Sequence, residues 1–217
     1  CACLWFLSAD KVAYMLTEVL DDADWTSPPD IMEFQIRYGD LVETIAEKVQ
    51  ALKMSGEEGA VARTEKAVLL YIMAPGIVNV MLNDKICVEH NLPLHPSVYY
   101  ELKEARKYRI DHGLPAVENA NRLYRESIDL ARKALRLDNS FKDHKADFLS
   151  RLPEELKGFV YTGVRDLYTW RGSQPALLKR LTSSLESDFE PDIIVAAAHG
   201  AIMPALLLAE LLAKPLY

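Results

Sequence analysis

Glycine and cysteine are both scarce in this sequence. Nine of its 217 residues are glycine, whereas average usage of about 7% would give roughly 15. So little glycine, beside abundant Leu, Ala, Glu and Lys, predicts helices joined by short connectors. Three cysteines are too few for a disulfide framework, so we expect a reducing, cytoplasmic setting.

Long apolar runs and an excess of basic residues are also missing. No apolar run reaches the roughly 18 residues that a membrane-spanning helix needs, so we expect no membrane partner. The formal net charge is −7, which argues against sequence-independent nucleic-acid binding, because that binding depends on Lys and Arg neutralising phosphates. Half of the residues are hydrophobic, enough for the substantial core of a globular protein.

Residues 8–137 carry the spacing of amphipathic helices, and we predict a mainly helical assembly with at most one short strand. Ser8 can cap a first helix. Asp40 and Glu43 have the spacing of a capping box. A helical stripe follows them, made of Leu41, Val42, Ile45, Ala46, Val49 and Leu52.

Proline and glycine mark the predicted ends of the next helices. A helix over Val61–Met73 should be interrupted by Pro75. The run Ile77–Leu82 fits either a short strand or a buried continuing helix, since periodicity alone cannot separate them. Another helix should run from Pro96 to His112, with Gly113 as its left-handed cap.

Pro115 should lie in the first turn of a further long helix that carries Leu123, Ile128 and Leu135. The polar segment Asp138–Lys157 is the candidate boundary between two parts. We therefore predict a helical domain over residues 1–150 and a different domain over residues 151–217.

The C-terminal stretch changes character and predicts a strand–helix–strand unit. Asp192–Ala198 is a short, continuous apolar run, which is typical of a buried parallel strand. Gly200 follows at once, Ile202–Ala213 is strongly helical, and Lys214–Tyr217 would begin a second strand. This order is a βαβ unit, the building block of a parallel α/β sheet.

These pieces resemble the opening of type I phosphoribosyltransferases, from about Tyr161 to Tyr217. In that family a first strand leads into a short loop, commonly Ala-Arg-Gly-Gly, and then into a helix that begins near a Pro-Ala pair. Here the loop reads Ala198-His199-Gly200-Ala201, and the pair is Pro204-Ala205. The fold class expected is thus a mainly α N-terminal domain joined to the start of a phosphoribosyltransferase-like α/β domain.

The resemblance implies that His199, Gly200 and Ala201 form a pyrophosphate-binding loop at a helix N-terminus. It also implies transfer of phosphoribosyl from phosphoribosyl pyrophosphate to a base, in nucleotide metabolism, with Mg²⁺ neutralising the pyrophosphate. His199 and Ala201 depart from the common loop. The family's acidic-pair strand and its Asp/Thr/Gly loop are not found in these 217 residues. Transfer therefore needs a domain completed beyond Tyr217, and we expect little or none from this chain alone.

Two other hypotheses stand beside this one. The protein could be a non-catalytic binding or regulatory protein with a degenerate fold, a helical interaction domain and a phosphorylated small molecule or a second copy as partner. Separately, Cys87, His90 and His95 are close enough in sequence to suggest zinc, although no second ligand pair completes the site. Solvated or hydrogen-bonded histidines explain the same spacing.

Overall fold

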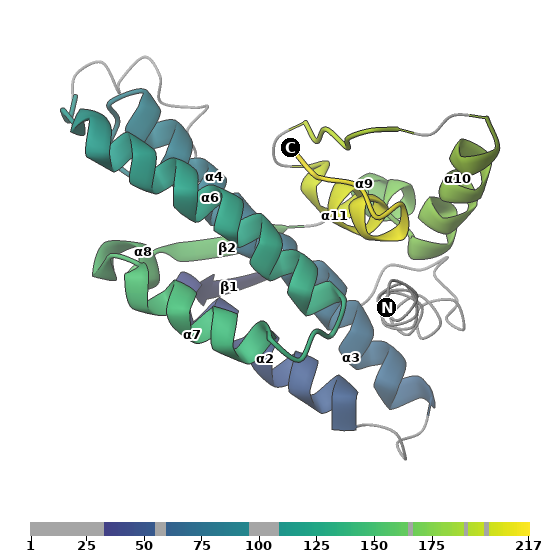
Figure 1. Ribbon diagram of the computed structural model, residues 1–217. Helices are drawn as coiled ribbons and strands as arrows, with labels where there is room; N and C mark the ends of the chain where they lie inside the picture. The colour runs from purple at the N-terminus through teal and green to yellow at the C-terminus, as the bar shows by residue number, and fades with distance from the viewer. Residues whose placement is uncertain (1–32, 55–59, 96–108, 165–166, 189–190, 198–199) are drawn as a thin grey trace, which may run out of the picture.

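The computed structural model describes residues 33–54, 60–95, 109–164, 167–188, 191–197 and 200–217. This part of the chain is mainly helical, as predicted, with a two-stranded antiparallel sheet (Figure 1). Its elements are β1 (Glu33–Arg37), α2 (Tyr38–Met54), α3 (Ala60–Met73), α4 (Pro75–Glu89), α6 (Gly113–Leu135), α7 (Phe141–Arg151), α8 (Glu154–Gly158), β2 (Val160–Val164), α9 (Leu167–Gly172), α10 (Pro175–Asp188) and α11 (Ile202–Leu211).

Two predicted helices concern residues outside these ranges. The helix expected from Ser8 lies outside the described residues entirely. The helix expected from Pro96 to His112 does so as well, except for its last residues, 109–112, which are not helical.

Helices α3 and α4 form a nearly continuous rod. Only Ala74 separates them, and its N–H donates to the carbonyl of Leu70 at 2.9 Å. Pro75 was expected to interrupt the helix, but it occupies the first turn of α4, where a missing N–H costs nothing. The ambiguous run Ile77–Leu82 is therefore helix rather than strand.

The α3–α4 rod is long and apolar enough to cross a membrane by composition alone, over Val61–Glu89. The apolar window is 83% buried inside the protein. Core helices of soluble proteins satisfy the same criterion, so this finding carries little weight for a membrane location.

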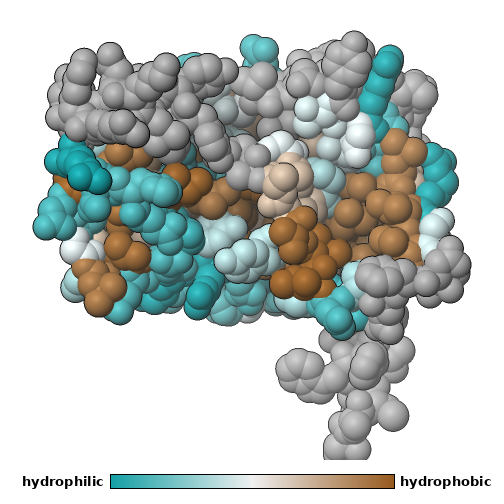
Figure 2. Space-filling model, turned by 90° about the horizontal axis from the view of Figure 1, so that it is seen from above, coloured by the Kyte–Doolittle hydropathy of each residue, from teal (hydrophilic) through white to brown (hydrophobic). Residues whose placement is uncertain are grey.

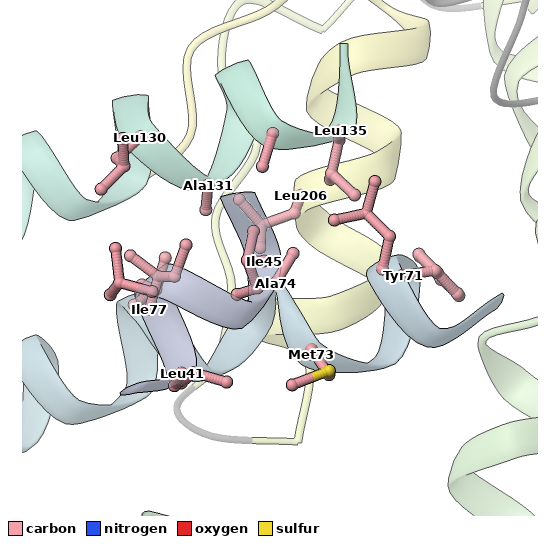
Figure 3. Close-up of a cluster of buried hydrophobic side chains, with 14 of the residues drawn as sticks. Leu41, Ile45, Tyr71, Met73, Ala74, Ile77, Leu130, Ala131, Leu135 and Leu206 are labelled. Carbon is pink, nitrogen blue, oxygen red and sulfur yellow. The ribbon is translucent and has the colours of Figure 1, made fainter. Parts of the chain in front are cut away.

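Side chains from helices α2, α3, α4, α6 and α11 meet in one hydrophobic core (Figure 3). The predicted stripe of α2 is buried in it through Leu41, Val42, Ile45, Val49 and Leu52. Ile77 of α4, Ala131 of α6 and Leu206 of α11 face this stripe and are all fully buried. Because α11 lies after residue 151 and α2 before it, both predicted domains contribute to this core, and the division itself stays a prediction.

The antiparallel sheet was not expected from the sequence. β1 pairs with β2 from Glu33–Val164 to Arg37–Val160. The alternation Glu33-Phe34-Gln35-Ile36-Arg37 is the signal that could have revealed β1, because polar and apolar residues alternate in a half-buried strand. Gly163 lets the strands meet closely, since a Cβ there would lie 2.5 Å from the ring of Phe34.

The C-terminal unit is only partly as predicted. Helix α11 is present, and the flanking segments pair in parallel, but among the described residues this pairing is a single bridge between Ile194 and Leu216. A parallel-sheet domain is therefore not what the described residues show. The reason is packing: α11 contacts the helices α4, α6 and α10 rather than the face of a broad sheet.

The predicted strand is not buried either. Val195 is 68% exposed and Ile193 is 47% exposed, and Tyr217 on the paired segment is 74% exposed. Figure 2 shows a hydrophobic area on the side of the molecule where α11 and the C-terminus lie in Figure 1. The continuous apolar run thus predicted an extended segment correctly but its burial wrongly.

Ion pairs join α11 to α6. The buried carboxylate of Glu210 accepts hydrogen bonds from the guanidinium groups of Arg132 on α6 and of Arg136, the C-cap residue of α6. Arg132 also donates to the carbonyl of Ala209 at 3.3 Å. The hydrogen bonds to Glu210 raise the pKa of Arg136 above its ordinary value. Such pairing is what allows a carboxylate to be buried.

Helices α4, α6 and α11 each end in a left-handed residue that is not glycine: Asn91, Leu137 and Ala213. At the end of α11, Lys214 N–H donates to Ala209 O at 3.0 Å and Ala213 N–H donates to Glu210 O at 3.2 Å. This is the Schellman pattern. The scarcity of glycine therefore leaves strained residues at positions that glycine usually fills. Gly113, predicted as such a cap, is left-handed but begins α6.

Ala213→Gly should stabilise the protein by about 0.5–1 kcal/mol, because glycine adopts the left-handed conformation without the penalty of a Cβ. Ala213 is exposed, so little packing is lost. The same change at Ala146, an exposed position within α7, should instead cost about 0.5–1 kcal/mol. Urea unfolding of both variants measures the two shifts, and equal signs would contradict the assigned cap.

Val195→Asp should change the unfolding free energy by no more than about 0.5 kcal/mol, because an exposed charge keeps its water. Leu206→Asp, at a fully buried position of α11, is the matched control and should unfold the protein, since it buries an unpaired charge. Thermal melts of the two variants make the comparison. A large loss of stability in Val195→Asp would show that this segment is covered.

Candidate functional site

The predicted pyrophosphate loop lies just before α11. His199 lies outside the described residues, whereas Gly200 and Ala201 are within them. Gly200 is exposed, and a Cβ added to it would meet no atom within 4 Å. Ala201 is the N-cap residue of α11, and no side chain caps the helix. Gly200 therefore faces open space.

In the described part of the chain, no acceptor is found for the first backbone N–H groups of α11. The first N–H groups of a helix have no intrahelical acceptor, and here they belong to Ile202 and Met203, since Pro204 has none. The helix dipole adds partial positive charge at this end. An anion would find two convergent N–H groups here, although their side chains are buried.

Backbone hydrogen bonds join the two segments that flank α11. Ile194 N–H donates to Pro215 O at 2.9 Å, Tyr217 N–H donates to Ile194 O at 2.8 Å, and Ala196 N–H donates to Tyr217 O at 3.0 Å. A single parallel bridge thus joins the segments before and after α11, whereas the sequence predicted a full strand on each side. A loop at the carboxyl end of a strand and the N-terminus of a helix is the usual place for phosphate groups in α/β folds.

The zinc hypothesis finds no support in the described residues. His90 is exposed at the end of α4, while Cys87 is buried, so the two side chains do not share one environment. Burial raises the pKa of the Cys87 thiol, and a hydrogen bond from the His95 backbone offsets part of this. No group of three His, Cys, Asp or Glu side chains in the described ranges is placed to hold a metal ion.

Sequence reasoning missed a cavity of about 230 Å³ between α4, α6 and α8. Asp84 and Cys87 of α4 line it, together with His112, which precedes α6, and Glu155 of α8. The sequence contains part of the signal for this cavity, because Asn79, Asn83 and Asp84 interrupt the apolar run of α4. Nothing in the sequence, however, placed Glu155, seventy residues further on, beside them.

Asp84 is the most perturbed acid of this cavity. Burial raises its pKa to about 6, the charge of His112 opposes this rise, and the charge of Glu155 adds to it. Near neutral pH the carboxylate is thus ionised in surroundings that disfavour its charge. Perturbed acids in cavities mark candidate functional sites.

Comparisons with family models, with curated proteins and with solved structures find no match to this chain.

Asp84→Asn should stabilise the protein at pH 7.5 by about 1–2 kcal/mol, a figure reduced from the full shift because the side chain is partly exposed. The folded pKa is raised, so the native state holds its proton more tightly than the unfolded state does. The wild-type protein is therefore most stable relative to the variant below pH 4 and loses this advantage as pH rises through about 6.

Urea unfolding of both proteins between pH 4 and 8 measures this difference. Asp143→Asn, which removes an exposed carboxylate from α7, is the control and should leave the difference near zero at every pH. A difference between wild type and Asp84→Asn that does not vary with pH would contradict the assignment.

Proposed function

We propose that residues 192–217 form the pyrophosphate-binding opening of a phosphoribosyltransferase-like domain. With the remaining strands of the sheet and a ribose-phosphate loop supplied, such a domain transfers phosphoribosyl from phosphoribosyl pyrophosphate to a base. The observation that supports the proposal is the parallel bridge Ile194–Leu216 on the two sides of α11, with the Gly200 loop between the first segment and the helix.

The chemistry of this loop suits the pyrophosphate group. Backbone N–H groups of Ile202 and Met203 and the positive end of α11 would bind phosphate oxygens. Open space around Gly200 permits close approach. His199 would add a charge-assisted hydrogen bond when protonated, so binding should strengthen as pH falls.

Magnesium has no evident protein site here. The described residues offer no cluster of carboxylates that could hold a metal ion. In the proposed function Mg²⁺ would arrive with the pyrophosphate and neutralise its charge. The proposal includes a cytoplasmic protein that acts on a phosphorylated small molecule, as a monomer or as a homo-oligomer.

One observation favours a second function, that of a non-catalytic binding protein. Helices of a βαβ unit normally cover the face of their sheet, whereas α11 packs against α4, α6 and α10 and is tied to α6 through Glu210. In this second proposal the βαβ unit is part of the helical assembly, and the loop before α11 serves only as a connection.

Titration of inorganic pyrophosphate into the 217-residue protein separates the two proposals. The first expects saturable binding that weakens at least fivefold in His199→Ala and in Gly200→Val. The valine should leave the fold intact, because no atom lies within 4 Å of the new Cβ. His144→Ala, at an exposed histidine of α7, is the control and should bind as wild type does.

Absence of pyrophosphate binding by the folded wild-type protein, or equal binding by all four proteins, would overturn the first proposal and leave the loop as a connection. Isothermal calorimetry gives the affinities, and circular dichroism confirms that each variant is folded. Base-dependent release of pyrophosphate by this chain alone should be undetectable, and ordinary enzymatic rates would show that no further loop is needed.

A further inference from the structure

The cavity between α4, α6 and α8 combines an acidic side with an apolar side. Asp84 and Glu155 supply carboxylates. Val88 of α4, Ala120 of α6 and Leu156 of α8 supply apolar walls, and all three side chains are buried. A ligand that fits must therefore carry a hydrogen-bond donor at one end and an apolar body at the other.

Two donors near Asp84 already have acceptors of their own. The hydroxyl of Tyr38, which is close enough to feel the charge of Asp84, donates to Ile77 O at 2.9 Å. The ammonium group of Lys85 pairs with Glu89 at 2.7 Å. The side chain of Asp84 itself takes part in no hydrogen bond or ion pair with the described part of the chain.

The ring of His112 also has a hydrogen-bond partner of its own. Its Nε2 lies 2.8 Å from the carbonyl oxygen of Leu92. A carbonyl can only accept, so this nitrogen carries the hydrogen, and in the neutral ring Nδ1 is then an acceptor. Asn91 holds the segment before α6 in place through two hydrogen bonds. Its carbonyl oxygen accepts from Ile110 N–H at 3.0 Å, and its side-chain oxygen accepts from His112 N–H at 3.3 Å. Hydrogen bonds thus hold this wall of the cavity in place, while the half-buried Asp84 carboxylate accepts no hydrogen bond from the described residues.

We propose that this cavity binds a small organic cation, an ammonium group on a short apolar body, with Asp84 as its counter-ion. The ammonium group donates hydrogen bonds to the Asp84 carboxylate and carries the opposite charge, and Glu155 adds to the negative field. Anionic ligands are disfavoured by the same two carboxylates. A bare metal ion is not supported, because no three ligating side chains converge there in the described residues.

The volume limits the ligand's size. About 230 Å³ is below the roughly 300–1,000 Å³ of sites for drug-sized molecules. It corresponds to about eight water molecules at ~30 Å³ each. A primary amine of fewer than about ten non-hydrogen atoms fits this space. The proposal does not depend on the function proposed for the loop before α11, which lies on a different helix.

Matched probes test the proposal on the full 217-residue protein. Benzylammonium and benzyl alcohol have nearly the same shape, but only the first carries a charge. At pH 8, ligand-observed NMR should show benzylammonium binding at least tenfold more tightly than benzyl alcohol. In Asp84→Asn the affinity for benzylammonium should fall at least tenfold, whereas that for benzyl alcohol should change less than twofold.

Two further variants locate the site. Ala116→Leu places added volume in the cavity from α6 and should abolish binding of both probes. Asp143→Asn removes an exposed carboxylate on α7 and should leave both affinities unchanged. Circular dichroism confirms that each variant is folded. No binding of benzylammonium by the wild type, equal binding of the two probes, or undiminished binding by Asp84→Asn or Ala116→Leu would each overturn the proposal.

Discussion

The α3–α4 rod buries side chains on almost every side, and the rest of the fold is arranged to cover it. From Ala67 to Met81 nearly every residue is buried, including Pro75 and Gly76. A helix that is apolar all round needs neighbours all round. Helices α2, α6 and α11 and strand β2 supply them. Gly76 allows the closest approach, since a Cβ there would lie 2.7 Å from side-chain atoms of both Leu41 and Tyr161.

This constraint explains which parts of the fold the sequence could predict. Helices α2 and α6 have one polar and one apolar face, so their spacing and their buried residues followed from periodicity. The first half of α4 is buried on every side, and for this reason Ile77–Leu82 could not be assigned to helix or strand from its pattern. β1 and β2 are five residues each, and strands so short give a weak pattern. Their pairing over more than one hundred residues of chain has no local signal at all.

The two candidate sites also differ in how far the sequence could predict them. The loop before α11 could be proposed from the sequence because its residues are consecutive, and a glycine between an apolar run and a helix is a local pattern. The cavity at Asp84 could not, because its residues come from α4, α6, α8 and the segment before α6. Burial of Val195 was predicted wrongly because an apolar run reveals that a segment is extended, but not whether other elements cover it. Contacts between residues distant in sequence determine both where the cavity forms and whether Val195 is buried.

The exposed pair of extended segments near the C-terminus has a consequence for the protein's behaviour in solution. Ile193 and Val195 project apolar side chains into solvent, and in the described part of the chain their segment is paired along one edge only, with residues 215–217. Open strand edges of this kind act as templates for other strands. Self-association would therefore begin here, from the folded state and increasingly with concentration, without any unfolding step. A strand that covers this edge would make the protein more soluble as well as more complete in its pairing.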